Sequence, residues 1–329
     1  MSLNKEESGT VLMVSVIVPT LGRPELLNRC LDALAGQNLD RSRYEVVVGD
    51  DGASAGTRLL VESYGGRIDV RYVPVTGRHG PAAARNAALR VAAGEIVAFT
   101  DDDCIPHPGW LRAGTRAFVD GIEGASGRVA VPISSRPTDY EVNAALLATS
   151  SFVTANCFYR KSALLAAAGF DEDFTAPWRE DSDLLFRLLA GQARLARAPE
   201  AVVTHPVRPA PWGVSIRQQK KSMFNALLYK KHPALYKKHI KPVRPWHYYG
   251  IVLALIASVA FGLKGMGGAS AAAASLWLAG TVLFCAHRLR GSSHAAGHVV
   301  EMAVTSALIP PLCIFWRLAG AIRYRVFFL

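Results

Sequence analysis

Short β-branched runs alternate with helix-like segments through the first hundred residues, and this alternation constrains the fold more than any other feature. The strand-like runs are compact and apolar, and they span residues 14–18, 44–48, 68–75 and 95–100. Between them, residues 24–34 carry apolar side chains at helical spacing, and residues 81–92 form an Ala-rich helical segment. Buried strands in alternation with helices are typical of a parallel, doubly wound α/β sheet, which is the predicted fold class.

The pattern continues to residue 206 and then changes. We expect four more elements: a strand at 127–131, helices at 161–168 and 181–190, and a final strand at 201–204. This change in the pattern of residues divides the chain into three parts. They are an α/β domain over residues 1–206, a basic amphipathic segment over residues 207–245, and a membrane region over residues 246–329.

The charge of the chain is divided between its two ends. From His205 onward there are sixteen Lys and Arg residues and one acid, Glu301, whereas the front carries 21 basic and 25 acidic residues. The basic residues are interleaved with apolar ones and lack the aromatic reading motifs of nucleic-acid binders, so a nucleic-acid partner is not expected. Residues 217–244 hold no acid, and their mixed pattern favours helices in a membrane interface, with a solvated basic face as the alternative.

Two apolar segments are long enough to cross a membrane. They span residues 246–263 and 269–286, and the first begins with the aromatic residues Trp246, Tyr248 and Tyr249. Residues 1–10 are polar and the apolar run after them is short, which does not fit a signal peptide. We therefore expect a multi-pass protein of the cytoplasmic membrane with its α/β domain on the cytoplasmic face.

The third apolar segment, residues 299–316, contains Pro310-Pro311 and is followed by Arg317, Arg323 and Arg325. A full crossing would place these arginines outside, against the positive-inside rule. We expect a re-entrant or interfacial helix instead. The five cysteines are scattered without metal-binding or paired spacing, and we expect them to be reduced thiols.

Polar and acidic residues directly follow the predicted strands. Thr20, Asp50-Asp51 and residues 101–103 each stand at a strand's carboxyl end, where open α/β sheets bind ligands. A single Asp after a strand is usually a turn or cap residue, but three such places on one edge weaken that interpretation. Asp101 and Asp103 point the same way in extended backbone, and paired carboxylates are suitable ligands for Mg²⁺ or Mn²⁺. The strand before them does not fit the helical DDxxD motif of prenyl-diphosphate synthases.

These residues, in this order, resemble the glycosyltransferases of family 2, which have the GT-A fold; the resemblance covers about residues 14–205. It is carried by Val-Ile-Val-Pro-Thr at 16–20, Asp50-Asp51-Gly52, Ala84-Arg85-Asn86, the DxD-like run at 101–103, Phe170-Asp171-Glu172 with Glu180-Asp181, and His205. The loop Gly52-Ala53-Ser54 departs from the family's Gly-Ser-Thr, in the turn that the resemblance assigns to contacts with the nucleotide base. The QxxRW motif of processive synthases is replaced by Gln218-Gln219-Lys220-Lys221-Ser222, which favours transfer of a single sugar.

The resemblance implies a role for each matching residue. A UDP- or GDP-linked sugar would contact Pro19, Thr20, Asp50, Asp51, Arg85, Asp101 and Asp102. A divalent cation, Mg²⁺ or Mn²⁺, would be held by Asp101, Asp103 and His205. A lone histidine in a loop is more often a structural residue, and this is the alternative to the ligand role of His205.

The resemblance implies an inverting, single-displacement reaction at the anomeric carbon of the sugar. Such a reaction needs a base for a hydroxyl acceptor, and we assign that role to Asp181, with Glu180 raising its pKa by like-charge repulsion. The alternative for this pair is an N-terminal helix cap, and both roles are compatible. A polyprenyl phosphate needs no base, so Asp181 favours a hydroxyl on a lipid-linked glycan or glycolipid. Transfer to a polyprenyl phosphate, a sugar nucleotidyltransferase and a non-catalytic membrane scaffold remain the alternatives.

Overall fold

The structure is a computed structural model that describes residues 14–240 and 245–328, and it divides into two compact units. Among the described residues, the first unit holds 14–130 and 148–206, and the second holds 131–147, 207–240 and 245–328. The polar segment 1–10 and part of the basic segment, residues 241–244, lie outside the described residues. The three-part division expected from the sequence stays a prediction.

The first unit is built on one eight-stranded sheet in the order β3-β2-β1-β4-β7-β6-β8-β5. Its strands are β1 Val14–Thr20, β2 Tyr44–Asp50, β3 Val70–Pro74, β4 Ile96–Phe99, β5 Ile105–Pro106, β6 Gly124–Ala130, β7 Cys157–Arg160 and β8 Leu195–Thr204. Strands β3, β2, β1 and β4 are parallel neighbours, whereas β7 pairs antiparallel with both β4 and β6. The predicted GT-A-like, mostly parallel sheet is confirmed.

Helices connect these strands and bury their apolar faces against the sheet. They are α1 Pro24–Ala35, α2 Ala55–Glu62, α3 Pro81–Val91, α4 Trp110–Thr115, α6 Lys161–Ala166 and α7 Glu180–Ala190. α3 packs directly on β1 and β2, and its small side chains allow a very close approach. A Cβ added at Gly49 of β2 would lie 2.3 Å from the backbone oxygen of Ala84.

Some elements differ from the sequence expectation. β5 and β7 and the helices α2 and α4 were not predicted, and β8 begins at Leu195 instead of residue 201. These elements are short or, in β8, lie partly at the surface, so their pattern of apolar residues is weak. The strands β5, β7 and β8 are held in place by pairing with strands that are distant in the sequence.

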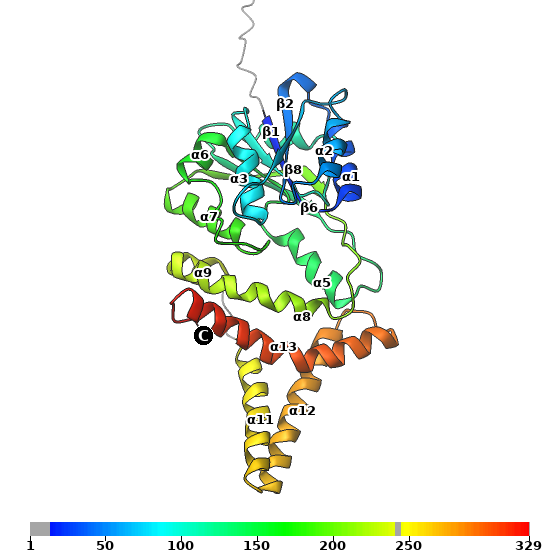
Figure 1. Cartoon of the computed structure of the whole chain (residues 1–329), viewed down its shortest axis with the longest axis vertical. Coiled ribbons are helices and arrows are strands. Elements are labelled where there is room, and N and C mark those ends of the chain that lie inside the picture. Colours follow the sequence, from blue (N-terminus) through cyan, green and yellow to red (C-terminus); the bar gives the residue numbers. More distant parts are fainter. Residues whose placement is uncertain (1–13, 241–244, 329) are drawn as a thin grey trace, which may run out of the picture. The chain divides into compact units, whose positions relative to one another are not determined.

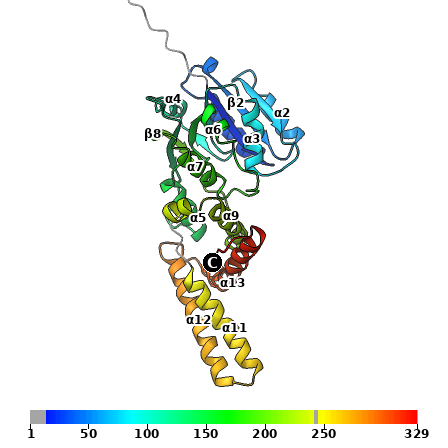
Figure 2. The same ribbon diagram turned by 90° about the vertical axis from the view of Figure 1, so that its left-hand side faces the viewer.

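The second unit is helical. Its elements include α5 Asp139–Ala145, α8 Val214–Gln218, α9 Met223–Lys231, α10 Pro233–Leu235, α11 Trp246–Leu263, α12 Gly267–Leu289 and α13 Ala296–Arg323. In the described part of the chain, three helices are long and apolar enough to cross a membrane: α11, α12 and α13. α11 and α12 lie side by side as a helical hairpin (Figure 2), at the positions predicted for the first two spans.

α13 continues through Pro310 and Pro311 as one helix. Figure 1 draws it running across the direction of α11 and α12, and it packs along α9. At that contact the backbones approach closely, because a Cβ on Gly320 would lie 2.6 Å from the oxygen of Met223. The expected re-entrant or interfacial placement of this segment stays a prediction.

Candidate active site

The carboxyl ends of β1, β2 and β4 meet at one edge of the sheet. Thr20 pairs in register with Asp50, and the Thr20 hydroxyl donates to Asp102 Oδ2 at 2.7 Å. Pro19 lies beyond Ile17, the last residue of β1 that pairs with β4, so its missing amide hydrogen costs no hydrogen bond to that strand. The predicted convergence of residues 20, 50 and 101–103 is therefore present.

Arg85 of α3 links two acidic parts of this unit that are far apart in sequence. Its guanidinium donates to Asp101 Oδ1 at 2.8 Å and to Glu180 Oε1 at 3.1 Å, and the side chain is only 3% exposed. Burial would lower the pKa of Arg85, but the two carboxylates raise it above its ordinary value, so Arg85 is a permanent cation. One buried charge thus joins the DxD-like run to the start of α7.

Asp102 is fully buried and turned toward the start of α1. Its Oδ1 lies 2.9 Å from Arg23, and Thr20 occupies Oδ2. Burial raises the pKa of Asp102 to about 6, although Arg23 and the Thr20 hydroxyl oppose that shift. The sequence reasoning missed Arg23, which also lies 3.7 Å from Asp103. Its position three residues after β1, at the same sheet edge, was the available signal.

Four side chains gather where a cation would bind. Ligand atoms of Asp101, Asp103, Cys104 and His205 all lie within 4.8 Å of one another. His205 follows β8, where its amide donates to Ala130 at 2.8 Å and its Nε2 lies 3.5 Å from Asp103 Oδ1. Burial raises the pKa of the Cys104 thiol, which makes it a poor ligand. Two carboxylates and an imidazole fit Mn²⁺ or Mg²⁺.

Asp50 and Asp51 organise the loop after β2. Asp50 accepts hydrogen bonds from the amides of Gly52 and Ser54 at 2.9 and 2.8 Å. Asp51 accepts from the amide of Gly80 and lies 3.0 Å from His79 Nδ1. Both carboxylates therefore shape the backbone at the sheet edge. Their predicted contacts to a nucleotide stay predictions.

Glu180 and Asp181 begin α7 and have different surroundings. Glu180 is buried, and this burial, reinforced by Asp181 and opposed by Arg85, raises its pKa to about 7. Asp181 is half-buried, and its Oδ1 accepts from the amide and hydroxyl of Ser182 at 2.6 and 3.2 Å. The like-charge repulsion that we expected to act on Asp181 instead contributes to the raised pKa of Glu180. Asp181 also takes part in the structure of the helix start.

Comparison with known proteins supports the resemblance to the glycosyltransferases of family 2. The family model of glycosyl transferase family 2 matches residues 15–164, and that of glycosyl transferase family group 2 matches residues 137–289. Glycosyltransferase AglE of Haloferax volcanii is 33% identical over 37% of this chain and 41% of its own length. The pre-mycofactocin glycosyltransferase of Mycobacterium tuberculosis is 31% identical over 59% of this chain and 43% of its own length. This chain therefore covers less than half of either relative.

Among solved structures, the mannosyltransferase PcManGT from Pyrobaculum calidifontis, in complex with GDP-Man and Mn²⁺, is similar with a TM-score of 0.61. The likeness covers 90% of this chain and 87% of that one at 22% sequence identity, so it shows a shared fold.

Proposed function

Because the chain belongs to glycosyl transferase family 2, we propose that it is a glycosyltransferase that moves a sugar from a UDP- or GDP-linked donor to a hydroxyl of a membrane-associated acceptor. The acceptor oxygen bonds to the anomeric carbon as the bond to the nucleoside diphosphate breaks, in one inverting step. The observation that carries this proposal is the contact of buried Arg85 with both Asp101 and Glu180, which joins the donor side to the acceptor side.

On the donor side, Asp101, Asp103 and His205 would hold the divalent cation. A bound cation supplies charge neutralisation for the departing diphosphate. Residues 19–20 and 50–51 would contact the nucleotide. Asp102, which the resemblance assigned to the nucleotide, is fully buried with its oxygens taken by Arg23 and Thr20, so its role would be to position these two residues. Arg85 keeps Asp101 oriented, because the buried guanidinium fixes Oδ1 at 2.8 Å. In this way the protein's own charges hold the carboxylates in place before the donor arrives.

On the acceptor side, Asp181 would take the proton of the attacking hydroxyl. It is half-buried, whereas its neighbour Glu180 is enclosed and paired with Arg85, so Asp181 is the more accessible of the two carboxylates. A positioned base typically contributes about 10²–10⁴-fold to the rate. A lipid-linked glycan or glycolipid suits a chain whose second unit has three apolar helices and a basic segment. We place the α/β unit on the cytoplasmic face by the positive-inside rule.

The test is incubation of the purified full chain with a panel of UDP- and GDP-sugars, Mn²⁺ or Mg²⁺, and membrane lipid extract. Released UDP or GDP together with a glycosylated lipid supports the proposal. Released pyrophosphate indicates nucleotidyl transfer, and binding without turnover indicates a scaffold. Asp181→Asn should lower turnover by about 10²–10⁴-fold and leave nucleotide binding intact. Asp173→Asn, at an exposed surface pair with Arg78, is the matched control. Normal turnover in Asp181→Asn would favour an acceptor that is already an anion.

A further inference from the structure

The second unit contains a cavity of about 300 Å³ that the mechanism above does not use. Three separate stretches of the chain line it: residues 138–141 at the start of α5, residues 207–215 ahead of and within α8, and residues 298–302 of α13. Arg288, at the end of α12, contacts two of its lining residues, Asp139 and Ser215. The cavity therefore lies where α12 ends and α13 begins.

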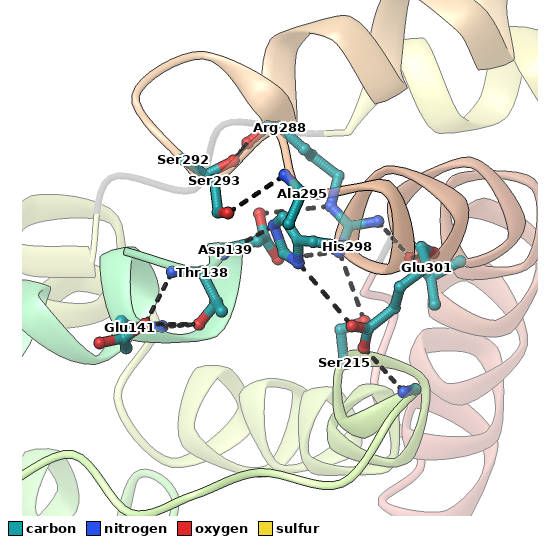
Figure 3. Close-up of polar contacts among 12 residues, drawn as sticks. Thr138, Asp139, Glu141, Ser215, Arg288, Ser292, Ser293, Ala295, His298 and Glu301 are labelled. Atoms are coloured by element: carbon teal, nitrogen blue, oxygen red, sulfur yellow. Dashed lines mark hydrogen bonds and ion pairs between the residues drawn. The ribbon is translucent and has the colours of Figure 1, made fainter. Parts of the chain in front are cut away.

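The carboxylates of the cavity are held in fixed positions (Figure 3). Asp139 forms a two-pronged pair with Arg288, at 2.8 Å to Oδ2 and 3.4 Å to Oδ1. Glu141 belongs to the capping box of α5 and accepts from the Thr138 amide at 2.7 Å. Glu301 accepts from the amide of Gly213 at 2.7 Å. Such fixed acceptors are ready to receive hydrogen bonds from a ligand without reorganising.

His298 adds a donor beside Glu301. Its Nε2 accepts from the amide of Asp139 at 3.3 Å, which places the proton of the neutral ring on Nδ1. Nδ1 lies 3.8 Å from Glu301 Oε2, too far for a direct hydrogen bond. One hydroxyl group at about 2.8 Å from both atoms would accept from His298 and donate to Glu301.

The charges of the lining favour a neutral, hydroxyl-bearing occupant over an anion. Three carboxylates, Asp139, Glu141 and Glu301, line the cavity against one lining cation, Arg208. The guanidinium of Arg288 beside the cavity is already engaged by Asp139, Thr305 and Ser306, so the balance of charge stays negative. A phosphate would therefore face net repulsion. The rest of the lining is largely apolar or aromatic, and it includes Val207, Pro209, Pro211, Val214, Met302 and Tyr140. Apolar surface combined with fixed hydrogen-bond acceptors suits a sugar ring, which has both C–H faces and hydroxyl groups.

The walls of the cavity continue directly from the strands that lead to the candidate cation ligand. β6 and β8 end side by side, with Ala130 in register with Thr204. One wall begins eight residues after Ala130 and the other at Val207, two residues after His205.

We propose that this cavity binds the neutral sugar portion of the acceptor, an inference that rests on the proposed glycosyl transfer and names its acceptor as a carbohydrate. Glu301, His298 and Asp139 bind the hydroxyl groups, and the apolar residues of 207–214 contact the ring. The class of reaction that supplies this substrate is then an earlier glycosylation of a membrane lipid.

The test is binding of hexyl glycosides, with glucosyl, galactosyl, mannosyl and N-acetylglucosaminyl heads, to the full chain in lipid nanodiscs, measured by calorimetry and ligand-observed NMR. Hexyl phosphate is the anionic comparison. We expect saturable binding of at least one glycoside and none of hexyl phosphate. Ala210→Trp, which fills the cavity from an exposed position, should abolish glycoside binding, whereas Ala234→Trp, equally exposed but outside the lining, should not.

A second variant avoids any change of shape. Glu301→Gln should weaken glycoside binding by at least about tenfold, because a hydrogen bond to a charged group is lost. Absence of glycoside binding, preference for hexyl phosphate, or equal binding by Ala210→Trp and the parent chain would overturn the proposal. Binding of UDP or GDP with Mn²⁺ is measured in parallel on the same samples. Glycoside binding without any nucleotide-sugar turnover in the parent chain would contradict the proposed function and leave the sugar site standing.

Discussion

At the scale of single residues, the site depends on how buried charges are balanced. Arg85 is shared between Asp101 and Glu180, and Arg23 is shared between Asp102 and Asp103. Each guanidinium therefore offsets repulsion between carboxylates that would otherwise be costly to bury. Even with Arg85 as its partner, buried Glu180 keeps a pKa that burial raises to about 7.

The raised pKa of Glu180 predicts a pH-dependent stability. The folded state binds a proton on Glu180 more tightly than the unfolded chain does, so this residue costs stability as pH rises from about 4.5 to 7 and costs most above that range. Glu180→Gln carries no such charge. Its free energy of unfolding should rise relative to the parent between pH 5 and 8, by on the order of 3 kcal/mol at most.

Thermal unfolding across this pH range checks the effect. Glu95→Gln, at an exposed position just before β4, is the control and should follow the parent at every pH. A constant difference between Glu180→Gln and the parent would show that Glu180 is ionised throughout.

The cation cluster gives a second prediction at this scale. Asp103→Asn and His205→Ala should each weaken Mn²⁺ binding by at least about tenfold, because each removes one of the few protein ligands. Electron paramagnetic resonance of free Mn²⁺ measures this directly. His107→Ala is the control, since that imidazole contacts Thr204 but is not one of the four clustered residues. Unchanged affinity in His205→Ala would assign His205 a structural role only.

At the scale of elements, the position of α3 sets the position of Arg85. The helix approaches β2 so closely that Gly49 has no room for a side chain, and the obstructing atom is backbone. Gly49→Ala should therefore displace α3, lower stability by about 1–3 kcal/mol and weaken nucleotide binding together with it. Thermal unfolding and nucleotide titration check this pair of effects. Gly66→Ala, where an added Cβ meets no atom within 4 Å, should change neither quantity.

The elements also show what the sequence could predict. Strands β1, β2 and β4 and helices α1 and α3 were found, because buried apolar runs and helical spacing are local signals. β7 was missed, since four residues from Cys157 to Arg160 carry little periodicity and the strand is defined by its partners β4 and β6. Long-range pairing of this kind is invisible to a local pattern.

The same limit applies to the site. The strand-end acids were predicted to converge because parallel strands share an edge, and they do. The pairing of Arg85 with Glu180 joins residues 95 positions apart, and no spacing in the sequence indicates it. Arg23 was overlooked for a related reason: its importance comes from Asp102, which is buried by the fold and needs a partner.

At the scale of the whole molecule, the arrangement in a membrane must accommodate both the three apolar helices and the basic residues at their ends. α11 and α12 form a hairpin with Lys264 as the basic residue of its tip, whereas Arg288 and Arg290 stand at the other end of α12. If α13 also crossed, Arg317, Arg323 and Arg325 would be carried to the outer side. Arg317 of α13 is buried against the ring of Phe328, which follows the end of that helix. Moving these arginines through the bilayer would be costly.

We therefore predict that α13 stays on the cytoplasmic side. Single cysteines in a cysteine-free background report this with a membrane-impermeant maleimide. Met266→Cys, in the hairpin tip, should react in intact cells, whereas Arg290→Cys and Phe327→Cys should react only after the cells are permeabilised; all three parent side chains are exposed. Arg290 serves as the internal control for the cytoplasmic side. Labelling of Phe327→Cys in intact cells would mean that α13 spans the bilayer, because two crossings return the chain to the side on which it began and a third does not.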